Sequence, residues 1–213
     1  MLKIKVCGMT DVLNVREVAE AGPDFIGFIF YPDSKRYIGK DQDEIIFNQV
    51  PSGIIKTGVF VNESIYKIMK HVRHYKLDAI QLHGSESPDY CYFIKSKGLI
   101  TIKAFGIGAD FDYNHLTPYL TSCDYFLFDS KTENLGGSGT KFKWDKLNEY
   151  QHDKYFFLSG GIGPEDIHDL KTLRHNRLFG IDINSRFESS PGIKDIEKLK
   201  VFFREIKKQG YEL

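Results

Sequence analysis

The chain has 213 residues, which is enough for one large hydrophobic core and short for two full domains. Hydrophobic residues make up 41% and charged residues 27%, a balance that excludes a disordered chain. The 29 basic and 29 acidic side chains cancel, so no overall positive charge favours nucleic acid or an anionic membrane.

The chain begins MLKIKVCGMT, where lysines interrupt the apolar run that a secretory signal would need. No stretch approaches the 18 apolar residues of a membrane span, so we expect no membrane association. The three cysteines, Cys7, Cys91 and Cys123, form no CxxC pair. This argues against a disulfide framework or a zinc site, and it predicts a cytoplasmic protein.

Eight short segments rich in Ile, Val, Phe or Tyr are predicted to be strands. In chain order they are residues 3–7, 24–30, 54–60, 78–82, 99–104, 124–129, 154–159 and 179–184. Segments with helical spacing separate most of them, at residues 10–22, 62–75, 86–98, 163–173 and 193–209. This alternation predicts an α/β fold with a parallel sheet, and eight units predict one (β/α)8, or TIM, barrel domain over residues 1–213. An open doubly wound sheet is the alternative, but the first strand is followed by CGMTD in place of GxGxxG.

Turns of small residues follow the last three predicted strands. In a (β/α)8 barrel the active site lies at the carboxyl ends of the strands, and phosphate is usually bound after strands 7 and 8. Here SGGIGPEDI follows the seventh strand, NSRFESSPG the eighth and GGSGT the sixth. Backbone N–H groups in such turns bind anions, so we expect a phosphate site, although any one such turn also occurs as a plain connection.

Seven segments, taken together, resemble the phosphoribosylanthranilate isomerase family. They are KVCGMT, YPDSKRYI, GVFVN, QLHG, FDSKTENLGGSGTKFKW, LSGGIGPEDI and INSRFESSPGIKD, in the family's order. The resemblance implies isomerisation of N-(5-phosphoribosyl)anthranilate to 1-(2-carboxyphenylamino)-1-deoxyribulose 5-phosphate, a step of tryptophan biosynthesis. It implies a small phosphosugar substrate and no metal or other cofactor, and we expect a monomer or a homodimer.

The resemblance makes Cys7 the general base, although cysteine by residue type alone is usually inert packing. An ordinary thiol has a pKa of about 8.5, so a useful base needs a lower pKa or a nearby positive charge. Strand alternation places Lys5 and Cys7 on one face, and barrel closure brings Asp182 of the last strand beside the first. Two interpretations of Lys5 stay open: it favours the thiolate, or it forms a purely structural pair with Asp182.

The resemblance makes Asp129 the general acid, which requires a raised pKa, although DSK also suits a turn cap. Arg36 matches the residue that binds the anthranilate carboxylate, since guanidinium pairs with a planar carboxylate; a solvated loop arginine is the alternative. Gln81 and His83 share a face of the fourth strand and should line the pocket. His83 is the second candidate base.

The phosphate is assigned to residues of the three turns. These are Gly136, Gly137, Ser138, Gly139, Gly160, Gly161, Asn184 and Ser185. The family usually has a glycine where this chain has Arg186, which either binds the phosphate or points outward.

Two other functions are considered. A histidine-pathway type of phosphosugar isomerase would pair two aspartates, and a non-catalytic phosphate-binding barrel would need neither Cys7 nor Asp129.

Overall fold

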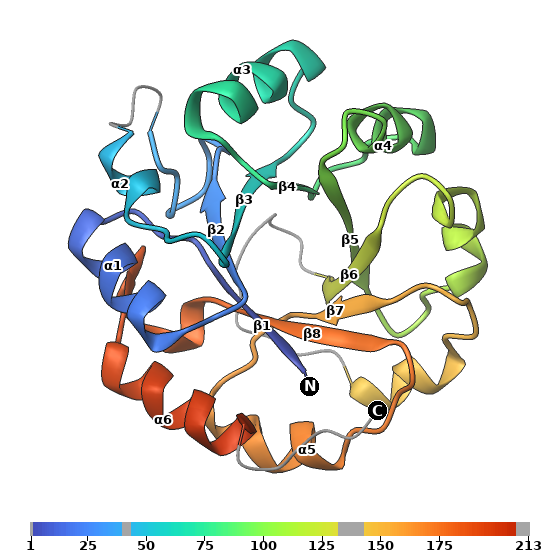
Figure 1. The fold of residues 1–213 in the computed structure, drawn as a ribbon. Helices are drawn as coiled ribbons and strands as arrows, with labels where there is room; N and C mark the ends of the chain where they lie inside the picture. The colour runs from blue at the N-terminus through green and yellow to red at the C-terminus, as the bar shows by residue number, and fades with distance from the viewer. Residues whose placement is uncertain (1, 40–43, 132–142, 208–213) are drawn as a thin grey trace.

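Eight parallel strands form a closed barrel in the computed structural model, which describes residues 2–39, 44–131 and 143–207 (Figure 1). The strands are β1 (Lys3–Cys7), β2 (Phe25–Ile29), β3 (Ile55–Phe60), β4 (Ala79–Leu82), β5 (Ile100–Ile107), β6 (Tyr125–Ser130), β7 (Phe156–Leu158) and β8 (Leu178–Ile183). Each strand pairs with the next in the chain, and β8 closes the ring against β1. The predicted parallel (β/α)8 barrel is confirmed.

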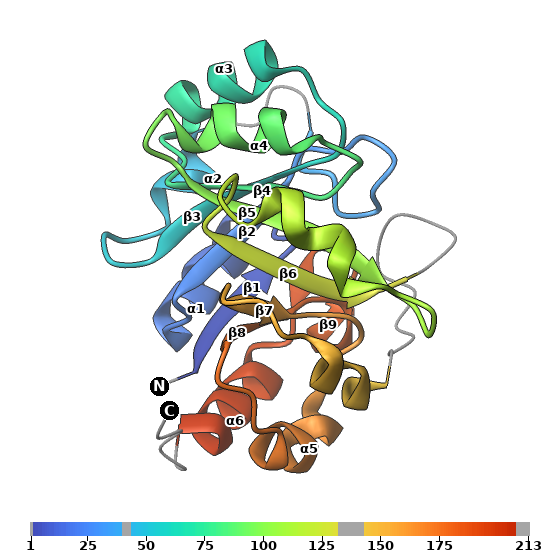
Figure 2. The ribbon, with the colours of Figure 1, turned by 90° about the vertical axis from the view of Figure 1, so that its right-hand side faces the viewer.

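Helices surround the barrel, with α3 and α4 on one side of the strands and α5 and α6 on the other (Figure 2). The α-helices are α1 (Val12–Ala21), α2 (Ile45–Asn48), α3 (Ile65–Tyr75), α4 (Pro88–Lys95), α5 (Ile167–Thr172) and α6 (Ile196–Lys207). The 3-10 helices are η1 (Tyr113–Tyr119), η2 (Trp144–Glu149), η3 (Pro164–Asp166) and η4 (Ser185–Phe187). Helix α1 begins where the Asp11 side chain accepts a hydrogen bond from Asn14 N, and it ends at Gly22 with a φ of 79°.

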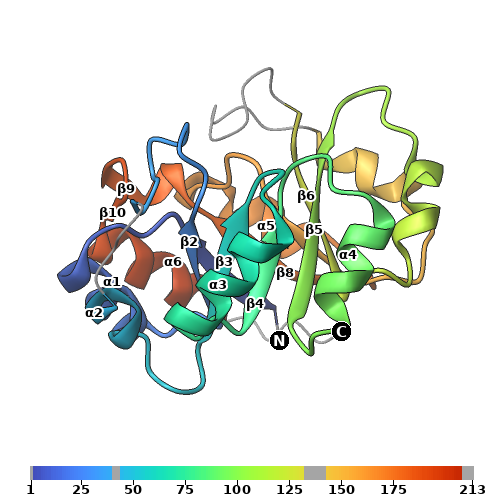
Figure 3. The same ribbon diagram turned by 90° about the horizontal axis from the view of Figure 1, so that it is seen from above.

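The connections between the strands are not uniform, as the sequence predicts by placing helical spacing between only most of them. In the described residues the connections after β5 and β6 contain η1 and η2 and no α-helix. Pro118 lies inside η1 and has no backbone N–H, which disfavours a regular α-helix there. A short hairpin, β9 (Glu188–Ser190) with β10 (Ile193–Lys194), was also not predicted; it lies near α1 (Figure 3). Within the described ranges, no helix is long and apolar enough to cross a membrane.

The core has two parts. The larger part packs the helices onto the outside of the strands, as in the contact of Phe47 on α2 with Phe28 on β2, whose ring centroids lie 4.5 Å apart. The smaller part fills the barrel interior with Phe25, Leu127 and Phe157, among others, and the Phe25 and Phe157 rings meet edge to face at 5.2 Å. The interior wall becomes polar toward the carboxyl ends of the strands, which is where the candidate site lies.

Candidate active site

A cavity of about 380 Å³ opens at the carboxyl ends of the strands. Its lining includes side chains from β1 to β6 and β8, together with the turn after β7. Cys7, Gln81, His83, Asp129 and Asp182 all line it, so the structure brings together five residues that the sequence singles out. In the described part of the chain, no group of three or more His, Cys, Asp or Glu side chains could hold a metal ion.

Cys7 ends β1 and is 4% exposed. Below it, Lys5 Nζ lies 2.9 Å from Asp182 Oδ1, and both side chains are buried. The pairing expected from strand alternation and barrel closure is therefore present, in register between β1 and β8. Burial raises the pKa of the Cys7 thiol; the positive charge of Lys5 opposes this shift, and Asp182 adds to it.

Gly27 on β2 provides the space that Cys7 occupies. The two residues are partners in the β1–β2 register. A Cβ atom on residue 27 would lie 2.7 Å from Cys7 Sγ and 3.2 Å from Lys5 Nζ. The absence of a side chain at this position therefore allows both groups to lie inside the barrel wall.

Asp129 near the end of β6 faces a short chain of polar side chains. Its Oδ1 accepts a hydrogen bond from Ser130 N at 2.8 Å, and its Oδ2 lies 3.5 Å from His83 Nε2. Gln81 Nε2 lies 2.8 Å from His83 Nδ1. Burial raises the pKa of Asp129 to about 6 and, with the positive charge of Lys103, lowers the pKa of His83 to about 4.

A buried ion pair supports the turn that carries His83. Lys103 on β5 and Glu86 after β4 lie 3.0 Å apart, and each side chain is 2% exposed. Lys103 also donates hydrogen bonds to the carbonyl oxygens of Leu82 and Gly84, while Glu86 accepts from the backbone of Asn62 and Gly84. This pair was not predicted from the sequence; the available clue was Lys103, a lysine inside the apolar run of β5, whereas Glu86 lies in the polar segment GSESPD.

The two described turns that are predicted to bind phosphate reach the cavity. Gly160, Gly161, Asn184 and Ser185 all line it. Gly160 has a φ of 91°, and a Cβ there would lie 2.3 Å from Ser130 Oγ, so only glycine allows this turn to pack against the end of β6. The helix expected after the turn begins as the three-residue η3 and continues as α5.

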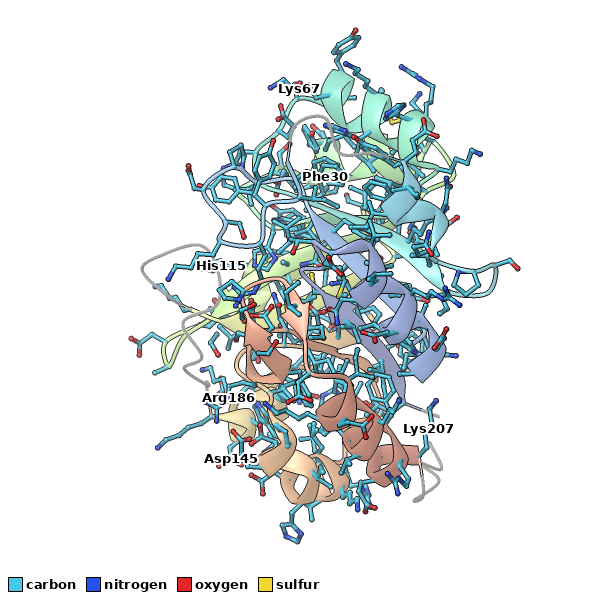
Figure 4. The ribbon with its side chains drawn as sticks, turned by 90° about the vertical axis from the view of Figure 1, so that its left-hand side faces the viewer. Phe30, Lys67, His115, Asp145, Arg186 and Lys207 are labelled. Carbon is cyan, nitrogen blue, oxygen red and sulfur yellow. The ribbon has the colours of Figure 1, made fainter. Side chains whose placement is uncertain are left out.

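The predicted phosphate residues of the third turn, Gly136, Gly137, Ser138 and Gly139, lie outside the described residues. Arg186 takes the outward alternative. Its Nη2 lies 2.5 Å from Glu165 Oε1, and both side chains are about half exposed (Figure 4).

Arg36 lies beside the cavity and is absent from its described lining. Its Nε and Nη2 donate to the two carboxylate oxygens of Glu188, at 2.7 and 2.6 Å. The solvated-loop alternative is wrong, because Arg36 is 9% exposed. Its side chain passes over Gly8, where a Cβ would lie 2.7 Å from Arg36 Cδ and the φ is 80°. Gly8 therefore allows both the sharp turn after Cys7 and the approach of Arg36.

Comparison with known proteins identifies the family. The family model for N-(5'phosphoribosyl)anthranilate (PRA) isomerase matches residues 4–205. The chain belongs to this family. A relative from Parabacteroides distasonis, named N-(5'-phosphoribosyl)anthranilate isomerase, is 45% identical over 206 residues, which cover 95% of this chain and 92% of the relative.

Solved PRA isomerases share the fold. The crystal structure of the enzyme from Thermotoga maritima has a TM-score of 0.85 and 34% identity, covering 98% of this chain and 100% of that one. Another, in complex with reduced 1-(o-carboxyphenylamino)-1-deoxyribulose 5-phosphate, has a TM-score of 0.82 and 31% identity over the same shares of both chains. These matches do not favour a histidine-pathway isomerase or a non-catalytic barrel.

Two further charged residues of this PRA isomerase family member were missed by sequence reasoning. Glu188 and Lys194 lie in the β9–β10 hairpin. In the structure the Lys194 side chain is fully buried and that of Glu188 is 5% exposed. Glu188 contacts Arg36, which lies 152 residues away in the sequence, so local patterns cannot reveal this contact.

Proposed function

We propose that this chain catalyses the isomerisation of N-(5'-phosphoribosyl)anthranilate to 1-(2-carboxyphenylamino)-1-deoxyribulose 5-phosphate in tryptophan biosynthesis. The observation that carries this proposal is that Cys7 and Asp129 line one cavity with the turns at Gly160–Gly161 and Asn184–Ser185, in a member of the PRA isomerase family. The reaction needs an acid, a base and an anion site, and these groups supply all three.

Asp129 is the proposed general acid. It donates its proton to the ribose ring oxygen as the bond from that oxygen to C1 breaks, which leaves a protonated imine between C1 and the anthranilate nitrogen. A carboxyl with a pKa of about 6 retains a protonated fraction near neutral pH, which an ordinary aspartate does not.

His83 is the proposed partner of the Asp129 carboxylate after proton transfer. With a pKa of about 4 the ring is neutral, and its Nδ1 accepts from Gln81. A neutral imidazole that accepts at Nδ1 carries its hydrogen on Nε2, which faces Asp129 at 3.5 Å. The same low pKa makes His83 a weak base, so it is less suited than a thiolate to remove a carbon-bound proton.

Cys7 is the proposed general base. Its thiolate removes the proton from C2, and the C–H electrons form a C1=C2 double bond as the imine nitrogen takes up electrons. The resulting enolamine then tautomerises to the ketone. Because the pKa of the thiol is raised, the thiolate is the minor form near neutral pH, but it is a strong base and lies beside the positive charge of Lys5.

The two ends of the substrate have separate proposed partners. Arg36 binds the anthranilate carboxylate, and the backbone at Gly160, Gly161, Asn184 and Ser185 binds the phosphate. For Gly136, Gly137, Ser138 and Gly139 the phosphate role stays a prediction.

We also infer a cytoplasmic location, a single domain, and a monomer or homodimer. The location is supported by Cys7, Cys91 and Cys123, which are all buried and all free thiols. The single domain is supported by the one closed barrel, whose strands and connecting turns carry every proposed residue in the described ranges. A phosphoribosylanthranilate isomerase from Thermotoga maritima is described as dimeric.

The test is an isomerase assay with N-(5'-phosphoribosyl)anthranilate generated in situ, followed by the loss of its anthranilate fluorescence. We expect turnover by the wild type and a large loss in Cys7→Ala and Asp129→Asn. An inactive, folded wild type would refute the proposed function.

A further inference from the structure

Arg36 belongs to a buried cluster of charges beside the cavity. Glu188 accepts from Arg36 through both carboxylate oxygens, and its Oε1 also accepts from Lys194 Nζ at 2.6 Å. Lys194 Nζ donates in addition to Asn184 Oδ1 at 2.7 Å, and Asn184 lines the cavity. Glu188 therefore holds two cations at fixed positions, one from the loop after β2 and one from β10.

The hairpin that carries Glu188 and Lys194 is itself anchored. Asn14, buried on α1, accepts a hydrogen bond from Lys194 N at 2.7 Å and donates one to Lys194 O at 2.9 Å. The N–H of Gly192 donates to Glu188 Oε1 at 3.2 Å. Because the Glu188 carboxylate is held by several hydrogen bonds, it gives the Arg36 guanidinium a defined orientation. Metal-binding side chains are oriented in the same way by the residues that hydrogen-bond to them.

The charge and geometry of the cluster leave Arg36 able to bind a second carboxylate. Two cations and one anion give the cluster a net positive charge, so Glu188 does not neutralise the site. A guanidinium has five N–H groups. Glu188 uses one on Nε and one on Nη2. Among the described residues these are the hydrogen bonds of the guanidinium, so the edge formed by Nη1 and Nη2 is the one that another planar carboxylate can use.

We propose that Glu188, held by Lys194, is a positioning residue that orients the Arg36 guanidinium for the carboxylate of the substrate's aromatic ring. The proposal rests on the proposed function, since it assigns Arg36 to that carboxylate. The competing interpretation is that Glu188 masks Arg36 and must be displaced by substrate. The two interpretations make opposite predictions for a variant that removes only the charge of Glu188.

Glu188→Gln separates the two. If Glu188 masks Arg36, or if its negative charge only repels the anionic substrate, the variant should bind the substrate more tightly and KM should fall. If Glu188 positions Arg36, KM should rise about tenfold with a smaller change in kcat, because the guanidinium loses its fixed orientation. Inhibition by free anthranilate should weaken by a similar factor, whereas inhibition by inorganic phosphate should stay at the wild-type level.

Two further variants complete the experiment. Glu188→Asp keeps the charge of the cluster but shortens the side chain, so it tests orientation even where the glutamine variant does not fold; KM should again rise severalfold. Glu197→Gln removes a carboxylate from an exposed pair with Lys200 on α6 and should behave as the wild type. An unchanged or lowered KM in a folded Glu188 variant, or equal losses for anthranilate and phosphate, would overturn the proposal. An inactive wild type would refute the proposed function instead.

Discussion

Lys5 Nζ and Asp182 Oδ1 lie 2.9 Å apart inside the barrel, directly below Cys7. Burial alone would lower the pKa of Lys5, but Asp182 and Cys7 raise it above its ordinary value, so Lys5 remains charged. For Cys7, the effect of Lys5 in lowering the thiol pKa is larger than that of Asp182 in raising it. Of the two interpretations of Lys5, this balance favours an electrostatic effect on the thiolate in addition to the structural pair with Asp182, and the role stays a prediction.

Lys5→Met should remove that field. The pKa of Cys7 should rise, kcat/KM should fall, and the alkaline limb of its pH profile should move to higher pH. Removal of Lys5 also leaves a buried carboxylate unpaired, so we expect a loss of about 3–5 kcal/mol in the free energy of unfolding. Lys3→Met is the matched control. Lys3 lies on β1 like Lys5, and its Nζ lies 2.8 Å from Asp24 Oδ1, but its side chain is 44% exposed. A pH profile like that of the wild type would rule out the electrostatic role of Lys5.

The pH dependence of kcat/KM should show a broad level region. The active form has Cys7 as thiolate and Asp129 protonated. As the pH falls below about 6, Asp129 becomes mostly protonated while the thiolate fraction of Cys7 keeps falling, so the rate falls. Between that pH and the raised pKa of Cys7, the gain in thiolate cancels the loss of protonated Asp129. Above the pKa of Cys7, only the loss continues. A rate that still rises tenfold per pH unit near pH 8 would contradict the role of Asp129.

Asp129→Asn should lose turnover and gain stability. Removal of a general acid typically costs about 10²–10⁴ in rate, and product binding should be retained. The folded-state pKa of about 6 lies above the ordinary value of 3.8, so the wild type loses stability as pH rises between these values. At pH 7 the free energy of unfolding of the variant should therefore be about 1–2 kcal/mol higher than that of the wild type, and this difference should disappear below about pH 4. Urea titrations at both pH values test this, with the exposed Asp145→Asn as control.

Lys103→Met should damage the support of His83. It leaves Glu86 buried and unpaired, which should cost about 3–5 kcal/mol of stability. Because the charge of Lys103 contributes to the low pKa of His83, the imidazole pKa should rise from about 4, as NMR titration of the ring nitrogens would show. Lys95→Met breaks a pair with Asp124 whose side chains are each 33% exposed, and it should cost less than about 1 kcal/mol. A His83 titration that is unchanged in Lys103→Met would show that the charge of Lys103 does not lower the pKa of His83.

Gly27→Ala should displace the proposed base. The added Cβ would lie 2.7 Å from Cys7 Sγ, so the thiol must move and kcat should fall at least about tenfold. Gly58→Ala is the control for general strain, since its Cβ would meet Leu77 and Phe60 at 2.7 Å in the core outside the strands. Equal kcat values in the two variants would show that Gly27 has no particular effect on Cys7.

Those parts of the fold that depend on residues close together in the sequence could be predicted. The limits of α1 follow from Asp11 as the cap and Gly22 as the end, and both are local. The β9–β10 hairpin escaped prediction because its strands have three and two residues and contacts from α1, such as those of Asn14, hold it in place. Helix η1 escaped because its segment has no apolar periodicity.

The same distinction applies to the site. The pairing of Lys5 with Asp182 could be predicted, because strand alternation and barrel closure together determine which residues meet. The contact of Arg36 with Glu188 could not, because it joins the loop after β2 to the β9–β10 hairpin, and tertiary packing sets the position of both. The raised pKa of Asp129 could be expected from its proposed role, but its cause, burial beneath the turn at Gly160, needed the structure.

The seam between β1 and β8 also has a consequence for folding. The pair of Lys5 and Asp182 joins residues 177 positions apart, so it forms only when the last strand docks on the first. Before that step the two charged groups remain hydrated, and Cys7 lacks one wall of its pocket. A fragment that contains only the first half of the barrel would therefore hold Cys7 and Lys5 without Asp182, the residue that pairs with Lys5 in the full chain. Ring closure and assembly of the proposed catalytic centre are therefore one event, and translation must reach β8 before it can occur.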